Sequence, residues 1–181
     1  MSLRKKIAQL AWEKPDLRPH LLPLLKEAQK PTKVIFVEAV LDRPQDLVSW
    51  WTRQGISSLA GWDVKAHHMT LEFLGGRGSA RDLIPYQDWI GKGVILKIKG
   101  YAVDDKGAAV LIDPGPLPVG NKYPHITVAV KGVSPVYSNQ LLEQGPIHPA
   151  TGSLSATVGY FDGNTRSDTF VLPPELLGQT F

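Results

Sequence analysis

The chain of 181 residues contains no cysteine and only two methionines. Without cysteine it can form no disulfide, no thiolate metal site and no iron–sulfur cluster, and it has no thiol nucleophile. No apolar run approaches the roughly 20 residues that a membrane-spanning helix requires. Residues 1–12 are basic and amphipathic, and they lack the apolar stretch and cleavage site of a secretory signal. We therefore expect a soluble, cytoplasmic protein that folds around an ordinary apolar core.

Acidic residues are scarce at the start of the chain, although the whole chain is nearly balanced, with 20 Lys and Arg against 17 Asp and Glu. Residues 1–33 hold eight basic and three acidic side chains, so this segment carries +5 and the other 148 residues carry −2. A basic segment of this kind can bind a polyanion through phosphate contacts. A solvated helical face has the same composition, and the sequence leaves both interpretations open.

Periodicity divides the chain into two parts. Apolar residues at helical spacing predict two helices within residues 2–30, with Pro15 between them and Pro31 after them. We therefore predict a basic helical hairpin over residues 1–31 and one main domain over residues 32–181.

The main domain has the pattern of strands with occasional helices and hairpin connections, which is typical of an α+β fold with largely antiparallel sheets. The predicted helices cover residues 44–54, 79–90 and 137–144. The predicted strands cover residues 33–41, 62–74, 93–103, 108–113, 124–130, 153–161 and 169–172.

Two of these strands contain the same pattern, His-x-Thr, as His68-Met69-Thr70 and His125-Ile126-Thr127. Because side chains alternate along a strand, each copy places an imidazole and a hydroxyl on one face, about 7 Å apart, and apolar residues on the other face. One copy alone would be typical of a half-exposed strand. Two copies in the same context indicate a site.

If the two strands lie side by side or across a cleft, the four groups surround a space the size of a small anion. A neutral imidazole can take a proton while a charged one gives a proton, and hydroxyls can donate to oxygens on which negative charge develops. This set suits in-line displacement at a phosphodiester. The sequence contains no apparent Ser-His-acid arrangement and no carboxylate-rich ligand set, so we expect neither a metal nor a cofactor.

The extended motifs, 68–75 (HMTLEFLG) and 124–129 (PHITVA), resemble those of the 2H phosphoesterase superfamily. They are similar in particular to its bacterial RNA 2′,3′-cyclic phosphodiesterase, or 2′,5′ RNA ligase, branch. The resemblance covers about residues 32–172, and only the two motif strands are specific. It implies a duplicated, bilobal α+β fold with largely antiparallel sheets around a central cleft.

By this resemblance, His68 and His125 form the acid/base pair, and Thr70 and Thr127 bind the phosphate. The sequence leaves open which histidine is the base. Lys131 stands where relatives often carry a basic residue, commonly arginine, and is a candidate phosphate contact.

The implied activity is metal-independent hydrolysis of 2′,3′-cyclic phosphate RNA ends or related small cyclic nucleotides, as in RNA processing and repair. One alternative is a hydrolase of cyclic oligonucleotide signals, of the kind used in phage anti-defence, with the same four residues. Another is a nucleic-acid-binding module without activity, with the basic hairpin as its main contact. We expect no membrane partner, and the oligomeric state stays open.

Three further residues are candidates for binding the substrate. Glu72 shares the face of Thr70 and could orient a group or read a base edge. Trp62 and Tyr123 flank the motif strands and could stack on a nucleobase. For each of the three, a structural or solvent-facing role is the alternative.

Two other features are expected to be structural. Alternation should turn His67 away from His68, toward core packing or a backbone hydrogen bond. Residues 75–78 are glycine-rich and are expected to form a turn, with a phosphate-binding loop as the alternative.

Overall fold

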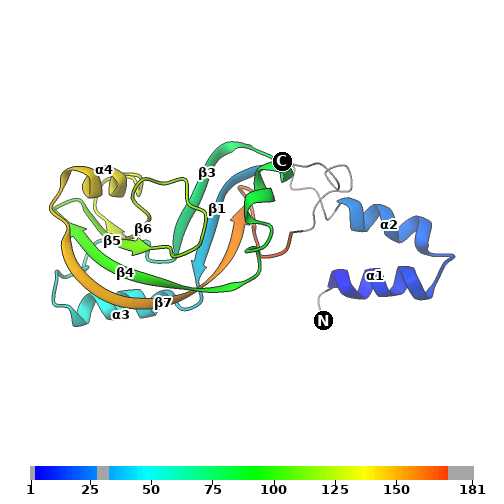
Figure 1. The fold of residues 1–181 in the computed structure, drawn as a ribbon, viewed down its shortest axis with the longest axis horizontal. Helices are drawn as coiled ribbons and strands as arrows, with labels where there is room; N and C mark the ends of the chain where they lie inside the picture. Colours follow the sequence, from blue (N-terminus) through cyan, green and yellow to red (C-terminus); the bar gives the residue numbers. More distant parts are fainter. Residues whose placement is uncertain (1–2, 28–32, 171–181) are drawn as a thin grey trace.

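The computed structural model describes residues 3–27 and 33–170, which form an α+β protein with one eight-stranded antiparallel sheet, four α-helices and one 3₁₀ helix (Figure 1). The strands are β1 (Val34–Leu41), β2 (Asp63–Val64), β3 (His68–Gly78), β4 (Gly93–Val103), β5 (Gly107–Asp113), β6 (His125–Val130), β7 (His148–Phe161) and β8 (Arg166–Ser167). The helices are α1 (Leu3–Glu13), α2 (Arg18–Glu27), α3 (Pro44–Arg53), the 3₁₀ helix η1 (Ala80–Tyr86) and α4 (Tyr137–Gln144). None of the helices in these ranges combines the length and apolar composition needed to span a lipid bilayer.

The strands are paired in the order β1-β3-β6-β5-β4-β7-β8, with β2 attached to β6. Since β1 also pairs with β7, six of the strands form a closed ring of pairings. One link of this ring is short: among the described residues β3 and β6 are paired only at Met69 and Ile126. The two strands that carry the His-x-Thr motifs are therefore neighbours that touch at a single point.

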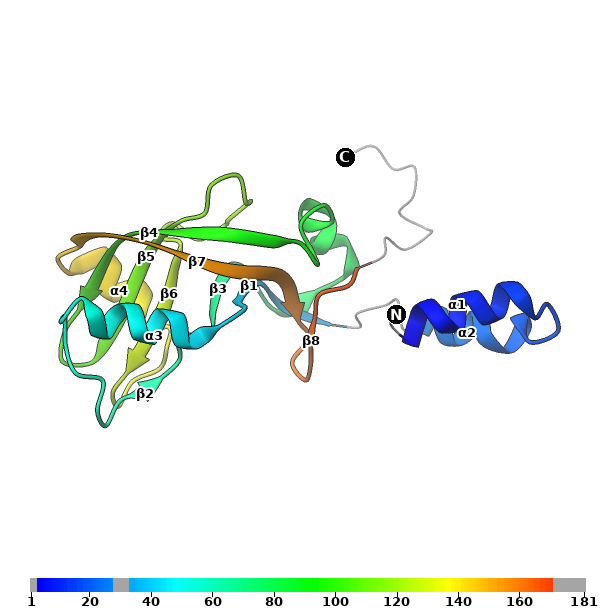
Figure 2. The same ribbon diagram turned by 90° about the horizontal axis from the view of Figure 1, so that it is seen from below.

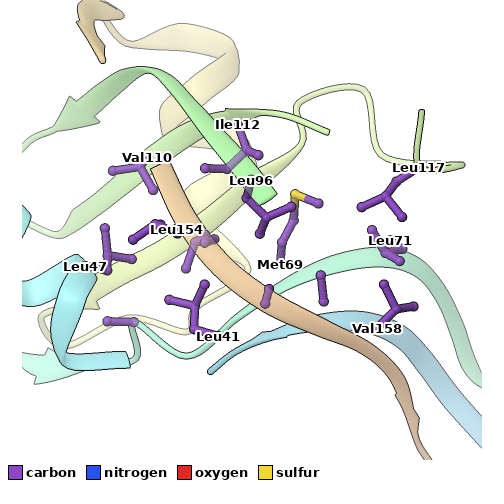
Figure 3. Close-up of a cluster of buried hydrophobic side chains, with 14 of the residues drawn as sticks. Leu41, Leu47, Met69, Leu71, Leu96, Val110, Ile112, Leu117, Leu154 and Val158 are labelled. Carbon is purple, nitrogen blue, oxygen red and sulfur yellow. The ribbon is translucent and has the colours of Figure 1, made fainter. Parts of the chain in front are cut away.

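Apolar side chains fill the space between the strands and α3 (Figure 3). Met69 and Leu71 from β3 and Ile126 and Val128 from β6 are all fully buried. Burying one such side chain is worth about 1.5–3 kcal/mol. Because the side-chain period of a strand is two, this burial fixes which residues of β3 and β6 face the other way.

Helix α3 covers this apolar core. Its first residue is Pro44, which suits the first helical turn because a proline there loses no hydrogen bond. Its face toward the core carries Leu47, Trp50 and Trp51. The two indole nitrogens donate to carbonyl oxygens, Trp50 to that of Thr151 at 3.0 Å and Trp51 to that of Ser57 at 3.1 Å, so neither buried donor is left unpaired.

Helix α4 packs on the other side of the sheet, against β5 and β4 (Figure 2). Leu141 and Leu142 pack against the small side chains of Ala102 and Ala109. At the start of the helix, the Tyr137 hydroxyl donates to an Asp104 carboxylate oxygen at 2.5 Å. The first turn of α4 is thereby held at the turn between β4 and β5.

The structure confirms most of the predicted elements, including the two N-terminal helices, and corrects three of them. The predicted strand over residues 62–74 is broken into β2 and β3, and β3 continues to Gly78 because positive φ at Gly75 and Gly76 lets it bulge and go on. The glycine-rich segment is therefore part of a strand. The predicted helix over 79–90 is shortened to the 3₁₀ helix η1, which contains Pro85. The predicted last strand over residues 169–172 is not formed at residues 169–170, and residues 171–172 lie outside the described part. The last described strand is β8.

The register of the motif strands depends on Met69, and its replacement tests this directly. We expect Met69→Ala to lower the free energy of unfolding by about 2–5 kcal/mol because it leaves a cavity between β3 and β6. Met69→Leu keeps the volume and should cost less than about 1.5 kcal/mol. Urea denaturation of both variants measures the difference. Equal, small losses would contradict the central role of this side chain.

Candidate active site

The antiparallel register of β3 and β6 brings the two His-x-Thr motifs together. Met69 and Ile126, the middle residues of the two motifs, are direct partners. Counting one residue outward on each strand sets His68 opposite Thr127 and Thr70 opposite His125. Each imidazole therefore has the hydroxyl of the other motif as its cross-strand neighbour.

One cavity of about 500 Å³ is lined by all four motif side chains. This volume is in the range of small-molecule sites. Its other walls come from β1, from the segments before β3 and β6, and from the first turn of α4. These remaining lining residues are Phe36, Lys65, His67, Leu71, Glu72, Phe73, Gly120, Asn121, Pro135, Val136 and Asn139.

His125 is buried and held by its own backbone neighbourhood. Its Nδ1 donates to the carbonyl oxygen of Tyr123 at 2.7 Å, which leaves Nε2 as the nitrogen without this proton. Burial lowers the pKa of His125, and the bond to the carbonyl partly opposes that shift. The resting group is thus a neutral imidazole with a defined tautomer.

His68 lies between two other rings. It stacks on Phe36, with the ring centroids 5.4 Å apart and the planes within 7°, and it meets the edge of His67 at 4.5 Å. Burial lowers the pKa of His68 to about 3. The charges of His67, Arg166 and His125 act in the same direction. His68 is therefore neutral at neutral pH.

The two threonine hydroxyls differ in their surroundings. Thr127 and Ser138 are hydrogen-bonded through their hydroxyls at 2.9 Å, and the Thr127 hydroxyl also lies 3.4 Å from the carbonyl oxygen of Pro135. Ser138 is fully buried in the first turn of α4. In the structure the Thr127 hydroxyl donates to Ser138, so for Thr127 to donate to a ligand its hydroxyl has to turn and Ser138 has to donate to it instead. Thr70 is half-buried and lines the cavity from β3.

Of the predicted binding residues, Glu72 lines the cavity. Its carboxylate packs closely on Gly120, where an added Cβ atom would lie 2.0 Å from Oε2 and would push the carboxylate aside. Burial, together with the charge and hydrogen bond of Glu72, raises the pKa of Tyr86 to about 12. Glu72 is thus held by two neighbours at the edge of the cavity.

The structure places the other three binding candidates outside the cavity lining. Lys131 is exposed just after β6, where its amide donates to the carbonyl of Lys106. Trp62 packs against the main core, and Tyr123 packs against the cluster under α4. Tyr123 still serves the site, because its carbonyl oxygen holds His125.

His67 corrects an expectation drawn from strand alternation. It lines the same cavity as His68 instead of facing away, because β3 begins only at His68 and the alternation of a strand does not extend to the preceding residue. The expected backbone hydrogen bond is present, between its Nδ1 and the carbonyl of Lys65.

Sequence reasoning missed several residues of the site. Lys65, which pairs with Asp63 at 2.7 Å, brings a cation to the cavity wall, and Ser138 reaches Thr127 from a distant helix. Glu38 lies beneath His68 and is fully buried. It had a visible signal, since it is the one charged residue within the apolar strand of residues 34–41.

The arrangement offers two neutral imidazoles and two hydroxyls around one cavity, a set that can move protons and bind an oxyanion. Among the residues that the structure describes, no group of three or more His, Asp or Glu side chains is arranged to hold a metal ion. No protein-family model matches the chain, and no curated protein matches its sequence.

The buried state of His68 can be tested by NMR. Its Cε1–H signal should show no titration step between about pH 5 and pH 8, whereas the same signal in urea should titrate near the ordinary value of about 6.5. Since only the unfolded state binds this proton below pH 6.5, the contribution of His68 makes stability fall as the pH decreases from about 6.5 toward 3, by up to about 1.4 kcal/mol per pH unit. A normal titration in the folded protein would contradict the burial.

Proposed function

We propose that this chain is a metal-independent phosphodiesterase of the 2H phosphoesterase type, which hydrolyses 2′,3′-cyclic phosphate RNA ends or related small cyclic nucleotides in the cytoplasm. The observation that carries the proposal is the pairing of the two His-x-Thr motifs about Met69 and Ile126. This pairing gives one cavity two acid/base groups and two hydrogen-bond donors.

The reaction follows from these groups. A water oxygen attacks phosphorus while one imidazole Nε2 takes the proton of that water. The other imidazole, protonated in the complex with the anionic substrate, gives its proton to the leaving ribose oxygen. Thr70 and Thr127 donate to the non-bridging oxygens as their charge grows. One P–O bond forms and one breaks, so the products are a phosphomonoester and a free hydroxyl.

The cavity walls support a nucleotide as the substrate. Phe73 and Val136 are 69% and 71% exposed, and both line the cavity. Such apolar surfaces can be covered by a base. Asn121 and Asn139 add amide groups that can bond to base edges, and Lys65, which is paired with Asp63, adds an ammonium group opposite the carboxylate of Glu72 in the charge balance. This balance suits a ligand with a single phosphodiester or the last nucleotide of an RNA.

The duplicated fold and a role for residues 1–31 belong to the same proposal. The local antiparallel pairing of the two motifs is what a duplicated, bilobal fold with a central cleft would produce. The basic hairpin of residues 1–31 is proposed as a contact for the remainder of an RNA substrate, through its positive charge. Its separation from the domain of residues 32–181 follows the break in the sequence pattern.

Hydrolysis of a 2′,3′-cyclic nucleotide in the presence of EDTA tests the activity. We expect His68→Ala and His125→Ala each to lower kcat by about 10²–10⁴-fold because each removes a proton-transfer group. Thr70→Ala and Thr127→Ala should each lose about 10²–10³-fold through the lost donor. His148→Ala, which changes an exposed histidine on β7 outside the cavity, is the matched control and should keep full activity.

The substrate panel should include cyclic mononucleotides, cyclic oligonucleotides and 2′–5′ linked dimers. Hydrolysis of only the cyclic oligonucleotides would replace the proposed substrate and keep the chemistry. Binding without turnover of any of them would favour the nucleic-acid-binding module. Full activity of both histidine variants would overturn the enzymatic assignment. The pH–rate profile should be bell-shaped and should report the imidazole pair as a unit.

A further inference from the structure

Glu38 is buried in a place where a carboxylate is costly. It lies in the middle of β1 between Val37 and Ala39, and its exposed fraction is 0%. Glutamate is almost never fully buried unless it is paired, because a charge loses its hydration in the interior. A role for each of its two oxygens must therefore be found.

One of the two oxygens is occupied by an arginine. Oε1 accepts a hydrogen bond from Nε of Arg166 at 2.7 Å. Arg166 belongs to β8, where it is paired with Phe161, and its guanidinium lies over the Phe161 ring at 5.6 Å. Two strands thus hold the carboxylate in a fixed orientation.

The other oxygen faces the first catalytic motif. Oε2 of Glu38 lies 3.6 Å from Nδ1 of His68. In the described part of the chain these two atoms are the only buried side-chain nitrogen or oxygen atoms without a hydrogen-bond partner. They are complementary, since a carboxylate oxygen only accepts and a protonated Nδ1 donates. A closure of about half an ångström would bring them to hydrogen-bond distance.

We propose that Glu38 is a positioning residue for His68: its Oε2 accepts the Nδ1 proton, which leaves the lone pair of Nε2 for the cavity. Arg166 fixes the carboxylate from the far side. The structural part of this inference stands without any activity, and its catalytic part rests on the proposed phosphodiesterase.

The histidine of the second motif has a backbone carbonyl where His68 has a carboxylate. This difference indicates which histidine acts as the base and which as the acid. His125 donates its Nδ1 proton to a backbone carbonyl, which carries no net charge. An imidazolium formed at His68 would instead face a carboxylate. We therefore assign His68 as the base that takes the proton from water and His125 as the acid that gives a proton to the leaving oxygen. After each turnover, His68 loses its proton to solvent and His125 regains one.

A positive charge on His68 is disfavoured by burial first, and then by His67 just before β3, Arg166 on β8 and His125 on β6. Glu38 is an acidic group that the structure places next to this ring. Its carboxylate is placed to offset these positive charges when His68 takes a proton.

The tautomer of His68 decides the structural part and is read from ¹⁵N chemical shifts of the ring nitrogens in the native protein. We expect the proton on Nδ1. In Glu38→Gln the amide keeps its oxygen toward Arg166 and turns its NH₂ toward His68, so the proton should move to Nε2. Glu143→Gln makes the same change at an exposed residue of α4 that pairs with Lys122, and it should leave the tautomer unchanged.

The kinetic consequence is measured on the same variants. Glu38→Gln should lower kcat about 10²-fold or more, with KM nearly unchanged, because the base is lost while the binding groups remain. Glu143→Gln should match the parent protein. Circular dichroism reports whether Glu38→Gln is folded, and if it is not, the tautomer of the parent protein still decides.

The outcomes separate this inference from the proposed function. A proton on Nε2 of His68 in the parent protein, or a folded Glu38→Gln with unchanged tautomer and kcat, overturns the role of Glu38. If turnover requires both histidines yet the tautomer is wrong, the function stands and this inference falls. If no cyclic nucleotide is hydrolysed while the tautomer follows Glu38, the positioning stands and the function falls.

Discussion

The contact between Met69 and Ile126 is the constraint on which the rest of the site depends. Both side chains are driven into the core by the hydrophobic effect, and they form the one described pairing between β3 and β6. With this register fixed, the period of two turns both His-x-Thr faces to the same side. A slip by one residue would bury the imidazoles and expose the apolar side chains.

The constraint also explains what the sequence could predict. The motif strand at residues 125–130 and the helix over residues 137–144 are local patterns, and each was found where it was expected. The burial of residues 125–130 does not alternate as predicted, because Ala129 is buried together with Val128 and Val130. The proposed chemistry requires the two motif strands to lie side by side or across a cleft, and the structure pairs β3 with β6. The prediction from strand alternation was wrong at His67, because this residue precedes the first residue of β3 by one position.

The parts of the site that escaped prediction depend on contacts between distant segments. Glu38 and Arg166 are 128 positions apart, and no local pattern connects them. The hydroxyl of Ser138 reaches Thr127 only because α4 packs against β4 and β5, next to the strand that carries Thr127. A lone acid within an apolar strand was the one local sign of such a partner, because a carboxylate remains in that position only when other residues offset its desolvation.

The two paired motifs form a symmetric framework, but the groups that support the two histidines at Nδ1 are different. The register relates His68 and Thr127 to His125 and Thr70 by a local two-fold exchange, so the framework alone gives the two imidazoles equal roles. Their supports differ, with a carboxylate and an arginine on one side and a carbonyl on the other. In the proposed reaction, acid and base must differ in proton affinity, so the direction of proton transfer would come from these supports, which lie outside the motifs.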